Sequence, residues 1–244
     1  MGDFSEIEGL QDLNLLRSLE FVGHSLKRIE NLGDLRNLEY LTINGSKNIK
    51  EIENLDNLSN LKGLDLCDNH IFNISGLDNL KNLKSLRIGN NFISEIKGIN
   101  NLIRLKELIL FNNNITEIKG LENLRNLEIL NLIGNKITEI QGFDNIINLE
   151  KLYLNGNHII EIKGLNSLSK LNILGLGDNK ICKVKNLDSL QTLECLDLKN
   201  NLLEDLHGLE RLPNLKRVDL SGNEVSIESS KILDMLREKR VTII

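Results

Sequence analysis

The chain has 244 residues, a formal net charge of -5 at pH 7 and a pI of about 5.5. A mildly acidic chain lacks the positive surface of a general nucleic-acid binder, and no apolar stretch approaches the roughly 18 to 20 residues of a membrane-spanning helix. Leucine, isoleucine and asparagine, with 50, 30 and 35 residues, supply nearly half of the chain, while alanine and tryptophan are absent. So narrow a composition predicts internal repetition.

Residues 1–15 form the first predicted segment, a half-repeat or N-terminal cap. The order Ile7-Glu8-Gly9-Leu10 matches the second half of a unit that recurs later in the chain. The segment has neither the basic nor the apolar region of a secretory signal. Three cysteines, an odd number without metal-ligand spacing, favour free thiols in a reducing compartment. We therefore expect a cytoplasmic or nuclear location, with a mature secreted form as the open alternative.

Residues 16–225 contain ten copies of one unit. Eight of the nine intervals between equivalent leucines are 22 residues and one is 23. The skeleton LxxLxLxxNxI at this period is typical of the leucine-rich repeat. The equivalent leucines are Leu16, Leu38, Leu61, Leu83, Leu105, Leu127, Leu149, Leu171, Leu193 and Leu215.

Each unit predicts one short strand. Leu130 and Leu132 point to one side of the chain while Asn131 points to the other, as in a β-strand. Parallel strands stacked about 4.8 Å apart join the leucines of all repeats into one apolar interior. The fold class is therefore α/β: a right-handed leucine-rich repeat solenoid, curved like a horseshoe, with a parallel concave β-sheet and short helical or extended convex turns.

Two positions of the repeat each hold a column of equivalent residues that we expect to stabilise the fold. A buried asparagine after each strand supplies the donor and acceptor that the inward turn needs. A second position holds glycine or asparagine, the residues that best tolerate a positive φ, so we expect left-handed backbone there. The first column is Asn69, Asn91, Asn113, Asn135, Asn157, Asn179, Asn201 and Asn223, with His24 and Ser46 in the first two repeats; the second is Gly76, Gly98, Gly120, Gly142, Gly164 and Gly208, with Asn31, Asn54 and Asn186.

Residues 226–244 lose the period and predict a C-terminal cap. Ile232, Met235 and Leu236 stand at helical spacing, and the segment begins with serines, which favour helix N-caps. We expect a terminal helix from residue 226 to 240 that covers the last repeat, followed by a short apolar tail.

The middle repeats are unexpectedly apolar at positions that face out from the concave sheet. A contiguous apolar patch on such a face favours a contact site for another protein. The alternative is that these bulky residues are present only because they favour β-strand structure. We expect charged side chains at the margins of this patch. The predicted patch is Ile109, Phe111, Ile129, Ile133, Tyr153 and Ile173, and its margins are Asp65, Arg87, Asp197, Asp219 and Arg217.

The unit resembles the 22-residue subclass found in the leucine-rich regulatory subunit of protein phosphatase 1, a resemblance carried by segments such as LKELILFNNNITEIKG at 105–120. It implies that acidic and aromatic residues at the central concave position contact a phosphatase. Here Arg87 and Gly175 interrupt that column, and tryptophan is absent. Bacterial adhesins of the internalin type share the subclass. The helix-plus-strand C-terminal segment looks closer to prokaryotic repeat proteins.

We therefore predict a monomeric, non-catalytic scaffold or adaptor that holds a folded protein partner on its concave face. Regulation of a phosphatase 1-like catalytic subunit and internalin-type adhesion are the two alternatives. The histidines and cysteines lie in separate repeats, so no catalytic pair, metal site or cofactor site is expected.

Overall fold

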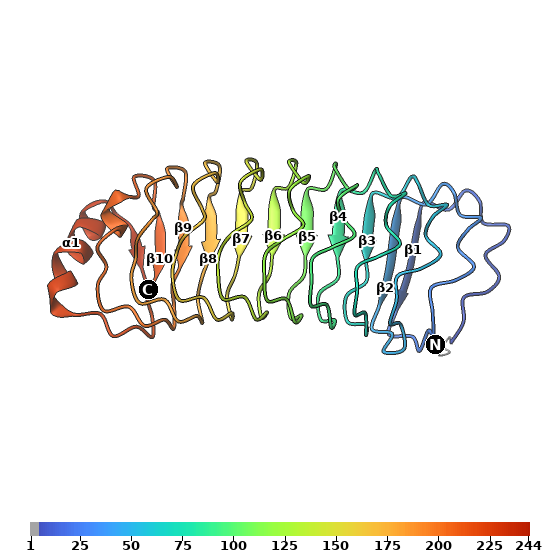
Figure 1. The fold of residues 1–244 in the computed structure, drawn as a ribbon, viewed down its shortest axis with the longest axis horizontal. Coiled ribbons are helices and arrows are strands. Elements are labelled where there is room, and N and C mark those ends of the chain that lie inside the picture. Colours follow the sequence, from blue (N-terminus) through green and yellow to red (C-terminus); the bar gives the residue numbers. More distant parts are fainter. Residues whose placement is uncertain (1–4) are drawn as a thin grey trace.

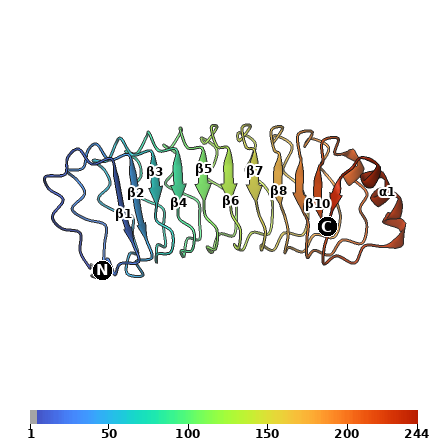
Figure 2. The ribbon, with the colours of Figure 1, turned by 180° about the vertical axis from the view of Figure 1, so that it is seen from behind.

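The computed structural model describes residues 5–244, which wind into a solenoid with one short strand per turn. All strands join a single parallel sheet in chain order, as the opposite views of Figures 1 and 2 show. The strands are β1 (Ser18–Val22), β2 (Tyr40–Asn44), β3 (Gly63–Asp65), β4 (Ser85–Arg87), β5 (Glu107–Ile109), β6 (Ile129–Asn131), β7 (Lys151–Tyr153), β8 (Ile173–Gly175), β9 (Cys195–Asp197), β10 (Arg217–Asp219) and β11 (Thr242–Ile243).

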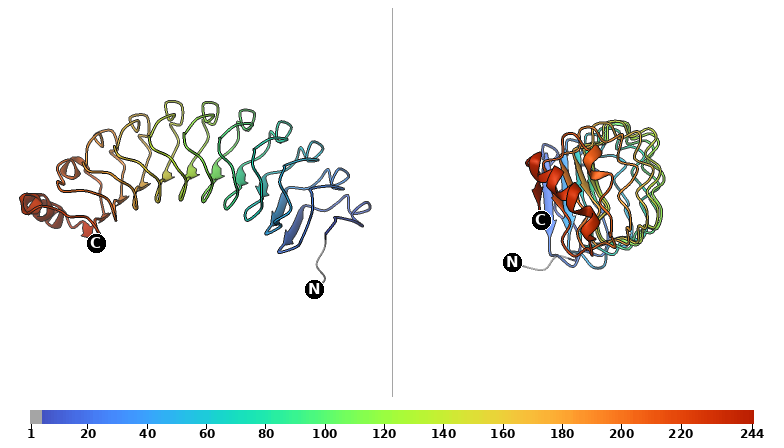
Figure 3. Two further views of the ribbon diagram at one scale, coloured as in Figure 1. Left: turned by 60° about the horizontal axis from the view of Figure 1, so that its bottom comes forward. Right: turned by 90° about the vertical axis from the view of Figure 1, so that its left-hand side faces the viewer.

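The solenoid curves so that the strands line its inner side and the return segments its outer side (Figure 3). Hydrogen bonding fixes the strands about 4.8 Å apart, whereas the bulkier return segments lie further apart, so the solenoid curves toward its sheet. The returns are turns and extended segments, with one 3-10 helix, η1 (Leu209–Arg211). The predicted leucine-rich repeat solenoid with a concave parallel sheet is thus confirmed.

The leucines and isoleucines of every turn meet inside the solenoid. In the turn that begins at Leu127, all seven apolar repeat positions are at most 1% exposed. A fully buried side chain of this size contributes roughly 1.5 to 3 kcal/mol relative to exposure, so stacked turns stabilise one another. These seven residues are Leu127, Leu130, Leu132, Ile137, Ile140, Phe143 and Ile146.

The asparagine column forms the predicted buried ladder. The amide of Asn135 donates to the carbonyl oxygens of Leu110, one turn back, and Leu132, both at 3.0 Å. Its Oδ1 accepts the N–H of Ile115 at 3.0 Å. The pattern recurs from Asn69 to Asn223, so each asparagine ties two turns together.

Ser46 replaces asparagine in the second turn, where the repeat is one residue longer. Its hydroxyl donates to the carbonyl of His24 at 2.7 Å, and its N–H donates to Oδ1 of Asn69 at 2.9 Å. Ser46 is fully buried. The ladder therefore continues through the irregular repeat with a shorter side chain.

The glycine and asparagine column is left-handed throughout, as predicted. At Gly164, with φ of 68°, a Cβ would collide with the carbonyl oxygen of Ile140 on the preceding turn. At Asn186, with φ of 59°, the side-chain amide donates instead to the equivalent carbonyl of Ile162 at 2.7 Å. Asparagine is therefore accommodated at this position, because its amide forms a hydrogen bond with the carbonyl oxygen that other side chains would collide with.

A second asparagine ladder, on the opposite edge of the sheet, was not predicted. Asn126, just before a repeat's first leucine, donates to the carbonyl of Ile103 at 2.8 Å, and its side chain is exposed. Equivalent bonds link neighbouring turns from Asn37, Asn60, Asn82, Asn148 and Asn214.

The C-terminal cap is a helix followed by a strand. A 3-10 turn, η2 (Ile227–Ser229), leads into α1 (Ser230–Glu238), which closes the end of the solenoid (Figure 3). Ile232 and Leu236 are buried as expected, but Met235 is 41% exposed. The apolar tail extends the sheet as β11, paired with β10.

The serine N-caps expected at this helix are wrong, because neither cap position makes a side-chain capping bond. Ser229 is fully buried, and its hydroxyl accepts the N–H of Leu206 at 3.1 Å. The hydroxyl therefore satisfies a backbone donor of the last turns and holds the cap against them.

Candidate protein-binding surface

The concave sheet presents alternate side chains of each strand. On β7, Leu152 is fully buried, whereas Lys151 and Tyr153 on either side of it are half-buried and face out. The same alternation places the third, fifth and seventh residues of each repeat in three parallel columns. Residues far apart in sequence become neighbours within a column.

The predicted apolar patch is divided into two. In the third-position column, Lys151 lies in register between Ile129 and Ile173. In the central column, Asn131 lies between Ile109 and Tyr153. One apolar cluster therefore lies on β5 and β6, and the other on β7 and β8.

Ile109 is a correction to the predicted surface, since only 7% of it is exposed. It stands in register between Arg87 and Asn131, at the strand spacing of about 4.8 Å. Its neighbours at that spacing leave little of it open to solvent. Phe111, Ile129, Ile133, Tyr153 and Ile173 stay half-buried and available for contact.

Each outward aromatic ring on the concave face is paired with a glycine of an adjacent turn. A Cβ at Gly63 would lie 2.8 Å from the Tyr40 ring, and one at Gly175 would lie 3.4 Å from the Tyr153 ring. The third ring, Phe111, covers a glycine on the preceding turn even more closely. The Tyr40 and Phe111 rings therefore fill space that a side chain at the adjacent position would need, whereas the Tyr153 ring makes an ordinary van der Waals contact.

The acidic margins also have a local role. Asp65, Asp197 and Asp219 each accept, at 3.0 Å, the backbone N–H of the residue two positions later. These bonds satisfy donors where the strands end. A short polar residue at the central position of a repeat could have indicated this hydrogen bond from the sequence alone.

The N-terminal margin contains an ion-pair cluster within the chain. Arg87 lies 3.3 Å from Glu107 and 3.9 Å from Asp65. Its position between two carboxylates on flanking strands explains why a basic residue interrupts the column. The arginine balances one of the two negative charges at this margin.

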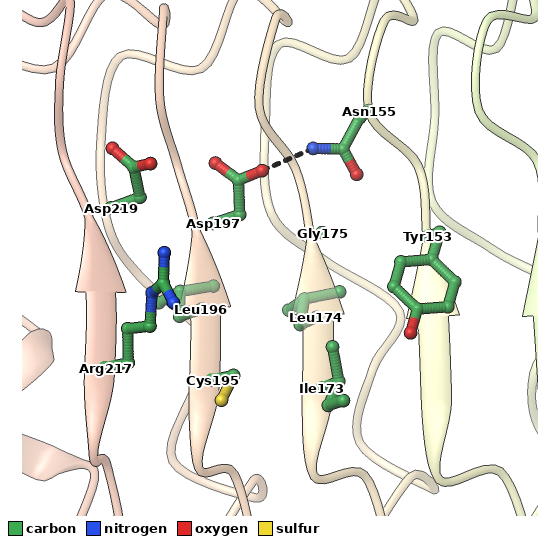
Figure 4. A pocket seen from close by; sticks show the side chains of 10 residues that line it. All are labelled: Tyr153, Asn155, Ile173, Leu174, Gly175, Cys195, Leu196, Asp197, Arg217 and Asp219. Atoms are coloured by element: carbon green, nitrogen blue, oxygen red, sulfur yellow. Dashed lines mark hydrogen bonds between the residues drawn. The ribbon is translucent and has the colours of Figure 1, made fainter. Parts of the chain in front are cut away.

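A hollow of about 240 Å³ opens at the other end of the sheet, on β7 to β10 (Figure 4). Gly175 leaves a gap in the central column between Tyr153 and Asp197. Above the gap, Asn155 donates to Oδ2 of Asp197 at 2.6 Å, across the turn that contains Gly177. Ile173 and Cys195 lie on the opposite side of the hollow.

Sequence analysis placed Tyr153, Ile173, Asp197, Asp219 and Arg217 at this surface but missed the hollow that joins them. Gly175 was taken as an interruption of the column, although it lines the hollow. This small residue at the central outward position between Tyr153 and Asp197 was the signal that could have revealed it.

Catalytic or metal chemistry finds little support in the residues that the structure describes. No group of three or more histidine, cysteine, aspartate or glutamate side chains in 5–244 is arranged to hold a metal ion. Burial raises the pKa of the Cys67 thiol to about 12, with the neighbouring Asp65 carboxylate adding to the effect. A thiol held in its protonated form is a poor nucleophile.

Comparisons with known proteins agree with this architecture. The family model described as leucine-rich repeats (2 copies) matches residues 103–145 and 191–231. No curated protein sequence matches the chain. No helix among residues 5–244 is long and apolar enough to cross a membrane.

Solved structures of bacterial proteins share the fold. An internalin, InlF, from Listeria monocytogenes is 27% identical with a TM-score of 0.89, over 99% of this chain and 70% of that protein. A Leptospira interrogans leucine-rich repeat protein is 29% identical with a TM-score of 0.87, over 96% and 62%. Internalin C2 of Listeria monocytogenes is 28% identical with a TM-score of 0.63, over 72% and 79%.

The repeat motif, the fold and these matches define the chain as a leucine-rich repeat protein. It is similar to internalins over nearly its whole length, while it spans 62% of the Leptospira protein. The resemblance to the phosphatase regulator has no counterpart among these matches.

Proposed function

We propose that this protein is a non-catalytic binding module that holds a folded protein partner on its concave sheet. The observation that carries the proposal is the set of outward apolar side chains along β5 to β8, with the Phe111 ring packed over Gly89. Exposed apolar groups gathered on one face favour a protein contact. Rigid aromatic anchors are also typical of the residues that dominate binding energy.

Affinity capture with paired variants tests this proposal. The wild-type chain is compared with a Phe111→Asp, Tyr153→Asp double variant, with circular dichroism and thermal denaturation to verify folding. The matched control is Phe72→Asp, Phe92→Asp, because these two rings are stacked and exposed at 48% and 42% on the flank of the solenoid. We expect the control to retain a partner that the concave-face variant loses.

Loss of the partner from both variants, or from neither, contradicts the concave-face placement. A partner lost only with the Phe72 and Phe92 changes would assign binding to the flank instead. Because all four substitutions introduce the same charge at partly exposed aromatic positions, a difference between the pairs reports location rather than chemistry.

An internalin-type role outside the cell is the second candidate, and the similarity to InlF over 99% of this chain supports it. Phosphatase regulation rests on the repeat subclass and on the acidic central positions Asp65, Asp197 and Asp219. Titration with a purified protein phosphatase 1 catalytic subunit separates the two. Micromolar or tighter binding that Tyr153→Asp abolishes would support the phosphatase role.

The cytoplasmic or nuclear location and the monomeric state stay predictions. Fractionation of the source cells, with detection on intact and on permeabilised cells, tests the first. Light scattering of the purified chain tests the second, with 27.7 kDa expected for a monomer.

A further inference from the structure

The hollow over Gly175 has two chemically different walls. The ring of Tyr153 stands on one side, and the carboxylates of Asp197 and Asp219 lie side by side on the other (Figure 4). Tyr153 and Asp197 are two strands apart, so roughly 10 Å separates their backbones. Asp219 lies one strand further away, so a group that contacts the ring and reaches both carboxylates must be an extended side chain.

The two carboxylates form an uncompensated pair. Asp197 and Asp219 are in register on adjacent strands, where like charges are destabilising. Among the described residues, 5–244, no basic side chain lies within 4.0 Å of either carboxylate. The hydrogen-bond donors at both carboxylates are neutral. Oδ1 of Asp219 accepts the N–H and the hydroxyl of Ser221, while Asp197 accepts the N–H of Lys199 and the side-chain amide of Asn155.

The other end of the same sheet resolves the same problem internally. There Arg87 pairs with Glu107 at 3.3 Å and approaches Asp65 at 3.9 Å. At Asp197 and Asp219, the equivalent cation is missing and a hollow takes its place. Charge complementarity therefore calls for a cation supplied from outside the chain.

We propose that this hollow binds an arginine side chain of the protein partner, a proposal that rests on the concave-face function above. The aliphatic stem of the arginine lies across Gly175 against the Tyr153 ring, and the planar guanidinium directs its N–H groups to the carboxylates of Asp197 and Asp219. Arginine meets both requirements because its stem packs on apolar surface while its guanidinium binds carboxylates through two parallel hydrogen bonds. A lysine ammonium has no planar fork with which to bridge the two carboxylates.

Arg217 is the chain's own competitor for these carboxylates. It stands two residues before Asp219 on the same face and lines the hollow. Its guanidinium forms no ion pair with either carboxylate among the described residues, and Figure 4 shows it below them. Removing its charge should therefore strengthen binding of an incoming cation.

NMR titration of the whole 15N-labelled chain tests the proposal without knowledge of the partner. The probes are Nα-acetyl-arginine amide, the neutral citrulline amide of nearly the same shape, and the lysine amide. We expect the arginine probe alone to shift the amide signals of Gly175, Gly177, Asp197 and Asp219, with a millimolar Kd.

Three variants make the charge argument specific. Asp219→Asn keeps an acceptor for Ser221 and should weaken arginine binding by about tenfold. Arg217→Gln should tighten it by about threefold. Asp65→Asn, at the equivalent position seven turns earlier, should leave it unchanged.

Equal responses to the citrulline or lysine probe overturn the proposal, as does unchanged affinity in Asp219→Asn or no shift on β7 to β10. These results leave the concave-face function untouched if Phe111→Asp, Tyr153→Asp still abolishes partner capture. Conversely, arginine binding with no concave-face partner contradicts the proposed function alone.

Discussion

The phenyl ring of Phe111 covers the backbone of Gly89 on the preceding turn. A Cβ at Gly89 would overlap three ring carbons, so glycine is required wherever this ring lies flat. The pairing explains why a small residue faces outward next to the largest apolar side chain of the middle repeats. It also links the shape of the concave face to its stability.

We expect Gly89→Ala to displace the Phe111 ring and lower the free energy of unfolding by about 1 to 2 kcal/mol, because the added methyl group overpacks the pair. Chemical denaturation measures the loss, and the Phe111 ring resonances report the displacement. Gly33→Ala is the control, since a Cβ there meets only the Asn57 amide at 3.3 Å. A larger effect at Gly33 than at Gly89 would contradict the pairing.

Asn135→Ala should lower the free energy of unfolding by about 3 kcal/mol. The change leaves the N–H of Ile115 buried without its acceptor, at a cost of roughly 1 to 3 kcal/mol, and the carbonyl of Leu110 keeps only the bond from Asn113. Asn126→Ala removes a bond from the exposed ladder and should cost less than about 1 kcal/mol, because water replaces the amide. Urea denaturation of both variants measures the difference, and similar losses would contradict the distinction between the ladders.

The loss of stability on substituting Gly164 should depend on the chemistry of the new side chain and not on its size alone. Gly164→Ala places a Cβ against the carbonyl of Ile140 at a left-handed position, and we expect a loss of about 2 kcal/mol. Gly164→Asn should cost less than half of this, because Asn186 occupies the same conformation and donates to Ile162. Thermal and chemical denaturation rank the two variants, and a reversed order would refute the role assigned to the amide.

His207 and Asp205 should make stability depend on pH. The hydrogen bond and the charge of Asp205 raise the pKa of His207 above its ordinary 6.5, and the His207 hydrogen bonds lower the pKa of Asp205 below 3.8. A raised folded-state pKa gives stabilisation that is complete below 6.5 and lost as pH rises through the raised value. A lowered carboxyl pKa gives stabilisation that is lost as pH falls through it.

Wild type should therefore exceed Asp205→Asn in stability most clearly between pH 3.8 and 6.5, with the difference shrinking at higher pH. An NMR titration should show the His207 pKa falling in Asp205→Asn. An unchanged His207 pKa in that variant would show that the two side chains do not interact in solution.

The repeat made the fold predictable, because every turn satisfies the same geometric requirements. Leu130 and Leu132 alternate with Asn131, and the spacing of 22 residues returns each leucine to the same depth. The buried asparagines and left-handed glycines followed from the donors, acceptors and φ angles that such a turn needs. A second left-handed position, held by residues such as Asn90, Asn112 and Gly134, was missed because its asparagines were read as outward side chains.

The surface was less predictable, since its properties depend on neighbours from different turns. The sequence placed Ile109 outward, but Arg87 and Asn131 on the flanking strands decide that it is buried. It predicted one contiguous patch, but strand register puts Lys151 between Ile129 and Ile173.

By itself, the sequence determined the solenoid, its core and its ladders, because these follow from the period within one chain segment. Only the tertiary structure decided that Tyr153, Asp197 and Asp219 surround a common hollow and that Asn155 reaches Asp197 across 42 residues. The physical reason is that the concave surface is formed by side chains from several neighbouring strands. Whether a residue projects, is covered or leaves a gap depends on the side chains that stand about 4.8 Å to either side of it.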